Sequence, residues 1–232
     1  MAQISFRKVV ISLVNKEFQR QQLKDILPPV KKKNPPCLTV SRETGSGGRL
    51  VAQIVAKKLK MKFYDKQFVE LIAKSTKKRK EVIESLDEKS KTMVEGIVDS
   101  LKPAKDKLSE ARYFEHLCQT ILSLSQKGKA VILGRGGNFI VPAKRCLRVR
   151  IIAPLKTRIK NSAQFENKSK QQAREDIKKI HTARKEFVSR YFLKDISNAN
   201  YYDLVINTKH LDLEQVVSII IKAFKQKFPQ AG

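Results

Sequence analysis

Residues 37–52 read CLTVSRETGSGGRLVA, and this stretch decides the fold. Its first part, Cys37–Ser41, is a short apolar run bounded by prolines and glycines, which predicts a buried strand. Beyond the glycines, apolar side chains recur at helical spacing, at Leu50, Val51, Ile54, Val55 and Leu59. A glycine-rich loop between a strand and a helix turns successive backbone N–H groups inward beside a helix N-terminus, and that geometry suits a phosphate group.

The loop departs from the common phosphate-binding spacing G-x-x-x-x-G-K-[ST]. Only the second glycine, Gly47, is kept, and Arg42 replaces the first glycine. Gly48 stands where the lysine is expected, and Arg49 where the hydroxyl residue is expected. Arginine can replace lysine because it neutralises phosphate through two parallel hydrogen bonds, but it cannot offer a hydroxyl oxygen to Mg²⁺.

Further short apolar runs alternate with helical patterns along the rest of the chain. They predict strands at 62–65, 130–134, 147–152 and 203–206. A long polar helix is expected over 168–193, and Asp212, three residues before Gln215, is expected to cap a final helix. Alternating strands and helices predict an α/β protein, with a parallel sheet covered by helices on both faces.

Two more strand ends carry polar residues. Gly134-Arg135-Gly136-Gly137 follows an apolar strand, and its arginine indicates either a second phosphate contact or a plain tight turn with a solvated Arg135. Tyr64-Asp65-Lys66 offers a carboxylate at another strand end, but it also fits a capped helix start. The histidines have no acidic or cysteine companions at ligand spacing, so no protein metal site is expected.

Composition narrows the function classes. The longest apolar run of the 232 residues, Val216–Ile221, is far too short to span a bilayer, and three cysteines without ligand or disulfide spacing favour a reducing cytoplasm. Lys plus Arg number 49 against 22 acidic residues, a net charge of +27. This charge attracts nucleotides, nucleic acid or anionic lipid, but it is spread along the chain and also fits a general enrichment in lysine.

Several blocks of the sequence resemble, in the same order, the cytidylate kinase-like family. The resemblance covers roughly residues 37–228, and its blocks are 39–52, 63–66, 86–89, 131–140, 148–155 and 202–208. The resemblance implies a three-layer P-loop kinase fold over residues 37–232, with a five-stranded parallel sheet. It also implies a helical insert near 66–127 that binds a nucleoside monophosphate and a basic lid near 155–195. Residues 1–36 lie outside it, as a basic helical appendage with a Pro-rich linker.

The resemblance implies ATP-dependent phosphoryl transfer to a nucleoside monophosphate, CMP or dCMP above all, with Mg²⁺ held mainly by phosphates and water. It assigns ATP binding to Arg42, Glu43, Thr44, Gly45, Ser46, Gly47, Gly48 and Arg49. It assigns acceptor binding to Tyr64, Asp65, Lys66 and Arg135, and catalysis to Arg49, Arg135, Arg158 and Arg184. Because the loop lacks the lysine and the hydroxyl residue, the alternative is a catalytically degenerate nucleotide- or RNA-binding protein of the same fold.

Deleting residues 1–36 should leave the remaining domain folded and its nucleotide affinity little changed, since these residues lie outside the resemblance and end in a Pro-rich linker. Thermal unfolding and nucleotide titration of the truncated protein measure both. An insoluble product, or one that melts far lower, would place the apolar stripe of Phe6–Phe18 in the core instead.

Overall fold

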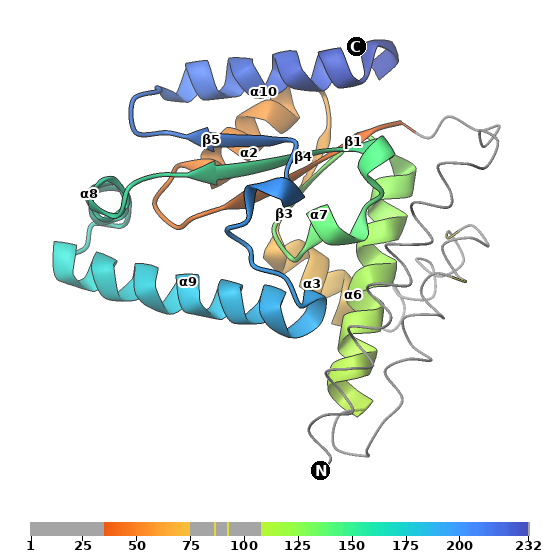
Figure 1. Cartoon of the computed structure of the whole chain (residues 1–232), viewed down its shortest axis with the longest axis horizontal. Helices are drawn as coiled ribbons and strands as arrows, with labels where there is room; N and C mark the ends of the chain where they lie inside the picture. The colour runs from red at the N-terminus through yellow and green to blue at the C-terminus, as the bar shows by residue number, and fades with distance from the viewer. Residues whose placement is uncertain (1–34, 75–85, 87–91, 93–107, 232) are drawn as a thin grey trace.

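The structure is a computed structural model that describes residues 35–74, 86, 92 and 108–231. The helix and linker expected over 1–34, and much of the insert expected near 66–127, lie outside the described residues. Five parallel strands form one sheet in the order β2-β3-β1-β4-β5 (Figure 1). Their bounds are Cys37–Arg42 (β1), Lys62–Tyr64 (β2), Ala130–Leu133 (β3), Cys146–Ile152 (β4) and Leu204–Asn207 (β5). The predicted parallel five-stranded sheet is therefore confirmed.

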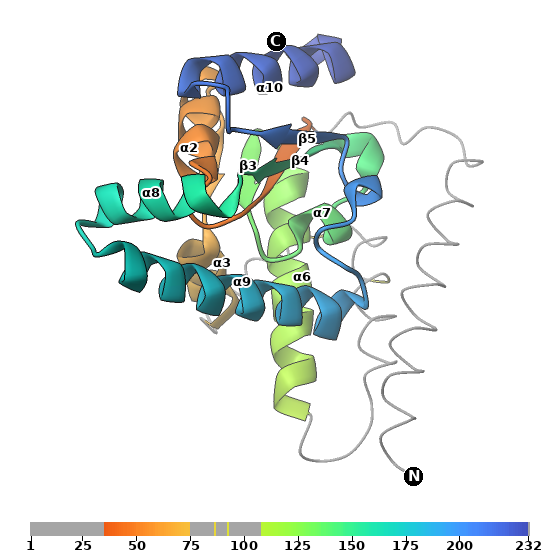
Figure 2. The same ribbon diagram turned by 60° about the vertical axis from the view of Figure 1, so that its left-hand side comes forward.

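Helices cover both faces of the sheet, so the protein has three layers (Figure 1). Helices α2 (Gly48–Lys58) and α10 (Leu213–Lys227) lie on one face. The other face carries α3 (Lys66–Lys74), α6 (Leu108–Lys127), α7 (Gly137–Ile140) and α9 (Lys170–Phe192). Helix α8 (Leu155–Glu166) packs against α9 beside the end of the sheet where β4 terminates (Figures 1 and 2).

The central strand β1 is buried on both faces, which explains its unbroken apolar sequence. Leu38 and Val40 face the core under α2 and α10, where Val55, Val217 and Ile220 are fully buried. The core on the other face is built from α6, α7, α9 and the sheet, with Leu117, Ile121 and Phe192 among its buried side chains. Each such side chain stabilises the fold by about 1.5–3 kcal/mol relative to exposure.

Helix starts agree with the sequence in most cases. Asp212 accepts a hydrogen bond from the backbone N–H of Gln215 (2.8 Å), while the Gln215 side chain accepts one from the N–H of Asp212 (2.9 Å), which confirms the expected cap of α10. Ser169 and Gln172 form the same reciprocal box at the start of α9. Pro154 lies at the N-cap of α8.

Asp203 joins three segments at the amino end of β5. Its carboxylate accepts a hydrogen bond from the Arg148 guanidinium (2.7 Å), one from the Arg148 backbone N–H (2.8 Å) and one from the Lys227 ammonium (2.8 Å). Burial alone would raise the pKa of Asp203, but the bonds from Arg148 and Lys227 outweigh it and lower the pKa to about 2. The ionised carboxylate therefore ties β4 and α10 to β5.

None of the described helices combines the length and apolar character that crossing a membrane requires. Cys37, Cys118 and Cys146 are all buried with free thiols.

Asp203→Asn should lower the free energy of unfolding by about 1–2 kcal/mol at neutral pH, because it weakens charge-assisted hydrogen bonds that are partly open to solvent. The folded-state pKa lies below the ordinary 3.8, so this stabilisation is present above that value and is lost as the pH falls through about 2. Urea unfolding at several pH values should show the two proteins converging in that window.

Glu214→Gln is the matched control, since it removes the exposed partner of Lys58. It should cost less than about 1 kcal/mol at any pH. Equal losses for the two variants would contradict the role of Asp203.

Candidate functional site

The loop after β1 is shaped by hydrogen bonds from its own residues and from the ends of β4 and β5. The backbone N–H of Glu43 donates to the carbonyl of Ile151 (3.0 Å), and the Ser46 hydroxyl donates to the carbonyl of Glu43 (2.8 Å). Thr208, just after β5, donates its hydroxyl to the carbonyl of Ser46 (3.1 Å). Gly45 and Gly47 have φ angles of 79° and 77°, which only glycine adopts freely. These bonds and the two glycine conformations fix the shape of the loop between β1 and α2.

Helix α8 presses against the outside of this loop. The Asn161 amide donates to the carbonyl of Gly45 (2.9 Å), and a Cβ at Gly45 would overlap the carbonyl oxygen of Arg158. The Arg158 guanidinium donates to the carbonyl of Ala153 (3.0 Å) and lies 3.4 Å from the carboxylate of Glu43, which also accepts the N–H of Ala153. Arg158 therefore fixes the loop to the start of α8.

Two polar atoms at this contact are left without hydrogen bonds within the described part of the chain. They are the hydroxyl of Thr44 and one terminal nitrogen of Arg158, and both are buried. Unsatisfied buried polar atoms are rare and each needs an explanation, such as a partner absent from the bare protein. They mark the loop as a place that an additional polar group would stabilise.

Arg49 opens α2 and turns toward the end of β2. Its guanidinium donates to the Asp65 carboxylate (2.7 Å), and its side chain is 56% exposed. The other oxygen of Asp65 accepts the N–H of Phe68 (3.0 Å), so Asp65 caps α3 as well as binding Arg49. Tyr64 lies beside Phe68, with ring centroids 5.2 Å apart, and burial raises the pKa of its phenol. The structure thus confirms the capped helix start that the sequence allowed, and Asp65 also pairs with Arg49.

Arg135 follows β3 and is not solvated. Its guanidinium lies 2.7 Å from the Glu70 carboxylate of α3 and 4.8 Å from the ring centroid of Phe187 on α9, with only 14% of its side chain exposed. Tyr113 on α6 donates its hydroxyl to the same Glu70 carboxylate (3.4 Å). Arg135 itself adopts a φ angle of 53°, an uncommon conformation for a residue with a side chain. The turn holds this arginine against two helices.

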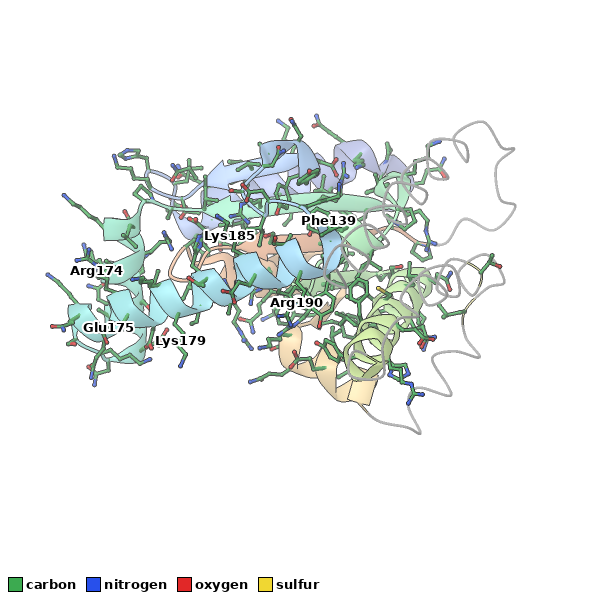
Figure 3. All side chains as sticks on the ribbon, turned by 60° about the horizontal axis from the view of Figure 1, so that its bottom comes forward. Phe139, Arg174, Glu175, Lys179, Lys185 and Arg190 are labelled. Carbon is green, nitrogen blue, oxygen red and sulfur yellow. The ribbon has the colours of Figure 1, made fainter. Side chains whose placement is uncertain are left out.

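Aromatic packing fixes the C-terminal half of α9 to the body of the protein. The ring of Phe192 lies 5.0 Å from Phe139 on α7 and 5.4 Å from Phe114 on α6. A Cβ at Gly136 would overlap the Phe192 ring, which explains the glycine after Arg135. In Figure 3, Lys179 and Lys185 lie on opposite sides of the α9 ribbon. The anchored half carries Arg184, whose guanidinium donates to the carbonyl of Arg42 (2.8 Å).

These contacts bring several arginines together at the carboxyl ends of β1, β3 and β4. Burial lowers the pKa of Arg42 to about 9, with help from Arg184, Arg49 and Arg135. Burial likewise lowers the pKa of Arg184 to about 10, with help from Arg135 and Arg150. Asp65 and Glu70 neutralise Arg49 and Arg135, but within the described residues no carboxylate lies within 4 Å of Arg42, Arg150 or Arg184. The site therefore carries uncompensated positive charge.

Arg150 is a site residue that the sequence interpretation missed. It is 3% exposed, donates to the Ser41 hydroxyl (2.9 Å) and lies over the Tyr202 ring at 5.5 Å. Arg148 lies two residues earlier on the same face of β4 and has its own carboxylate in Asp203. Two arginines at alternate positions of an apolar strand were the available signal, since both had to point into the same buried layer.

Only some of the candidate residues lie together in the site. Arg42, Arg49, Arg135 and Arg184 share one electrostatic environment, whereas Arg158 is engaged with Glu43. Lys66 begins α3 and is exposed. The described residues contain no group of three or more His, Cys, Asp or Glu side chains able to hold a metal ion.

A sequence model of the cytidylate kinase-like family matches residues 37–210. The chain belongs to this family. A cytidylate kinase of Archaeoglobus fulgidus is 32% identical over 198 residues, which cover 82% of this chain and 95% of the relative. A cytidylate kinase of Sulfolobus acidocaldarius is 26% identical over 190 residues, with 82% and 94% of the two chains covered.

Among solved structures, an uncharacterized protein from Eubacterium ventriosum superposes with a TM-score of 0.60 at 20% identity. The match covers 82% of this chain and 98% of that protein. It supports the fold alone. With the family match, it establishes the P-loop kinase architecture that the ordered blocks of sequence implied.

Gly45→Ala and Gly47→Ala test the contact between the loop and α8. Both variants force alanine into a left-handed conformation, at about 1–2 kcal/mol. A Cβ at Gly47 meets nothing within 4 Å, whereas a Cβ at Gly45 meets the rigid backbone of Arg158. Urea unfolding should show Gly45→Ala losing about 1–3 kcal/mol more than Gly47→Ala. Equal losses would mean that α8 does not press on the loop.

Proposed function

We propose that this protein transfers the γ-phosphoryl group of ATP to a nucleoside monophosphate, with CMP or dCMP as the leading acceptor. The observation that carries the proposal is the set of guanidinium groups of Arg42, Arg150 and Arg184, which have no carboxylate partner within the described residues. Removing an unpaired charge from water raises the free energy of the folded protein, and an anionic ligand with several phosphates offsets this increase. Membership of the family and the names of the two cytidylate kinases support the same reaction.

The donor is expected on the loop between β1 and α2. Its inward-turned N–H groups and the start of α2 offer a site for the phosphates of ATP, and Gly45 and Gly47 give the close approach that this requires. Arg42 and Arg184 lie at the mouth of the loop. Phosphoryl transfer depends mainly on alignment of the donor with the acceptor and on neutralisation of the charge on the transferred group. Arginines held in fixed positions can provide both.

The acceptor is expected at the ends of β2 and β3. Arg135 supplies the positive charge for its phosphate, and Tyr64 with Phe68 offers exposed aromatic surface nearby. In the protein without ligand, the Glu70 carboxylate forms an ion pair with Arg135. The acceptor phosphate therefore replaces a carboxylate on Arg135 when it binds, and the ion pair holds the guanidinium ready in its absence.

Mg²⁺ enters as part of the Mg–ATP substrate. The position of the usual hydroxyl ligand is taken by Arg49, and the Ser46 hydroxyl shares its single proton between the carbonyls of Glu43 (2.8 Å) and Ile151 (3.3 Å). The ion is thus expected to stay on phosphate oxygens and water. Helices α8 and α9, the expected lid, border the site and would exclude water from it.

The cytoplasm is the expected compartment, because the buried cysteines are free thiols. The net charge of +27 also permits non-specific contact with nucleic acid, which the alternative of a non-catalytic nucleotide- or RNA-binding protein would use.

A coupled ADP-release assay with ATP, Mg²⁺ and each nucleoside monophosphate tests the proposal. Turnover is expected with CMP or dCMP and should be slower with the other monophosphates. ATP binding without turnover on any acceptor would refute the kinase and leave the non-catalytic alternative.

Arg184→Met should lower kcat/KM by about tenfold or more, because it removes a charge-assisted contact to the transferred phosphoryl group while keeping the aliphatic length of the side chain. Lys179→Met removes one positive charge from the same helix, at an exposed position away from the site, and should leave kcat/KM within about twofold (Figure 3). If both variants lose activity equally, the general charge of α9 matters and the position of Arg184 does not.

A further inference from the structure

The side chain of Arg42 fills the space around Gly48. A Cβ placed on Gly48 would lie 2.6 Å from the Cβ of Arg42 and 3.2 Å from its Cγ. The Cβ of a residue cannot swing aside as the end of a long side chain can, because it is fixed to the backbone. Any side chain at position 48 therefore collides with Arg42.

The far end of Arg42 reaches the end of β3. A Cβ on Gly134 would lie 2.5 Å from one terminal nitrogen of the Arg42 guanidinium. Arg42 thus crosses from the end of β1, over the first residue of α2, to the end of the neighbouring strand. In an open α/β sheet this is the crevice where ligands bind. Glycines at 48 and 134 leave room for the crossing.

The guanidinium of Arg42 is not used within the protein. Among the residues that the structure describes, none accepts a hydrogen bond from it and no carboxylate lies within 4 Å of it, although the charge of Asp65 attracts it from farther away. Arg49, the other arginine of the loop, is more exposed and is bound to Asp65. Of these two side chains, Arg42 is therefore the one available to a ligand at the mouth of the loop.

We propose that Arg42 takes over the task of the P-loop lysine, so that the motif is rearranged and not lost. In the usual motif the cation stands in the first turn of α2, whereas here it stands at the end of β1. The missing side chain at Gly48 leaves the space that Arg42 fills. The two departures from the usual spacing, an arginine for the first glycine and a glycine for the lysine, are thus one spatial exchange. This inference rests on the proposed function, because it assigns Arg42 to the phosphates of the ATP donor.

Electrostatics agrees with this assignment. Arg184, Arg49 and Arg135 all repel the charge of Arg42. Within the protein, the attraction of Asp65 opposes this repulsion from three arginines, and a chain of phosphates would relieve the repulsion further. Bidentate binding by arginine offers the same charge as lysine with stricter geometry.

Four proteins test the exchange: the wild type, Arg42→Gly, Gly48→Lys and the double variant. Calorimetric titration with Mg–ATP measures donor binding, and ADP release with CMP measures turnover separately. Arg42→Gly should weaken ATP binding by about tenfold to hundredfold. Gly48→Lys should lower both the melting temperature and the ATP affinity, because Arg42 is still present.

The double variant should recover ATP affinity to within about tenfold of the wild type. Without Arg42, the nearest remaining obstacle to a Cβ at position 48 is the Cβ of Ile151 at 3.3 Å, which a shift of a few tenths of an ångström relieves. Arg174→Ala, at an exposed arginine of α9, controls for loss of one positive charge and should bind ATP as the wild type does. A double variant no better than Arg42→Gly overturns the exchange.

Arg42→Lys and Arg42→Met give a second comparison that keeps the backbone restraint and the Cβ of residue 42. Lysine should retain ATP affinity within about tenfold, and methionine should lose it as glycine does. Equal affinities for these two variants would overturn the role of the charge. If the binding pattern holds but no monophosphate is phosphorylated, the proposed reaction fails and the exchange stands. If turnover is intact in Arg42→Met, the exchange fails and the reaction stands.

Discussion

The burial of positive charge at the carboxyl end of the sheet is the constraint on which the site depends. A guanidinium group removed from water destabilises the fold unless an anion lies close to it. The described residues provide such anions for Arg148 and Arg158, through Asp203 and Glu43. Arg150 contacts a hydroxyl and an aromatic ring, and no carboxylate of the described residues lies within 4 Å of it. In the function that we propose, the phosphates of a nucleotide supply the negative charge that these arginines lack.

Close packing around the arginines holds them in this arrangement. Phe192 and its aromatic neighbours hold α9 against α6 and α7, and this anchoring carries Arg184 to the carbonyl of Arg42. Glycines allow the approach where a side chain would not fit, at Gly136 against Phe192 and at Gly45 against α8. The same packing that stabilises the second core therefore also positions the charge.

Much of the fold could be predicted from the sequence because its strands are apolar runs between turn residues, and parallel order follows from their alternation with helices. The edge of the sheet that carries the candidate site could also be predicted, since the carboxyl ends of parallel strands lie at the same edge. The partners of single side chains did not follow: the pairing of Arg49 with Asp65, or of Arg135 with Glu70, depends on how α2 and α3 are rotated against the sheet. The contact between Arg42 and Gly48 could not be predicted either. A comparison with the P-loop motif position by position shows only which motif residues are missing, and not which residues lie together in space.

Binding of donor and acceptor side by side is the central claim, and a bisubstrate ligand tests it most directly. In such a ligand a pentaphosphate chain joins adenosine to cytidine. If the loop after β1 and the end of β3 hold the two halves together, calorimetry should show affinity about tenfold or more above that of ATP or CMP alone, since the second half binds at high effective concentration. An affinity no higher than that of ATP alone would contradict the account, because it would mean that the arginines serve a single nucleotide.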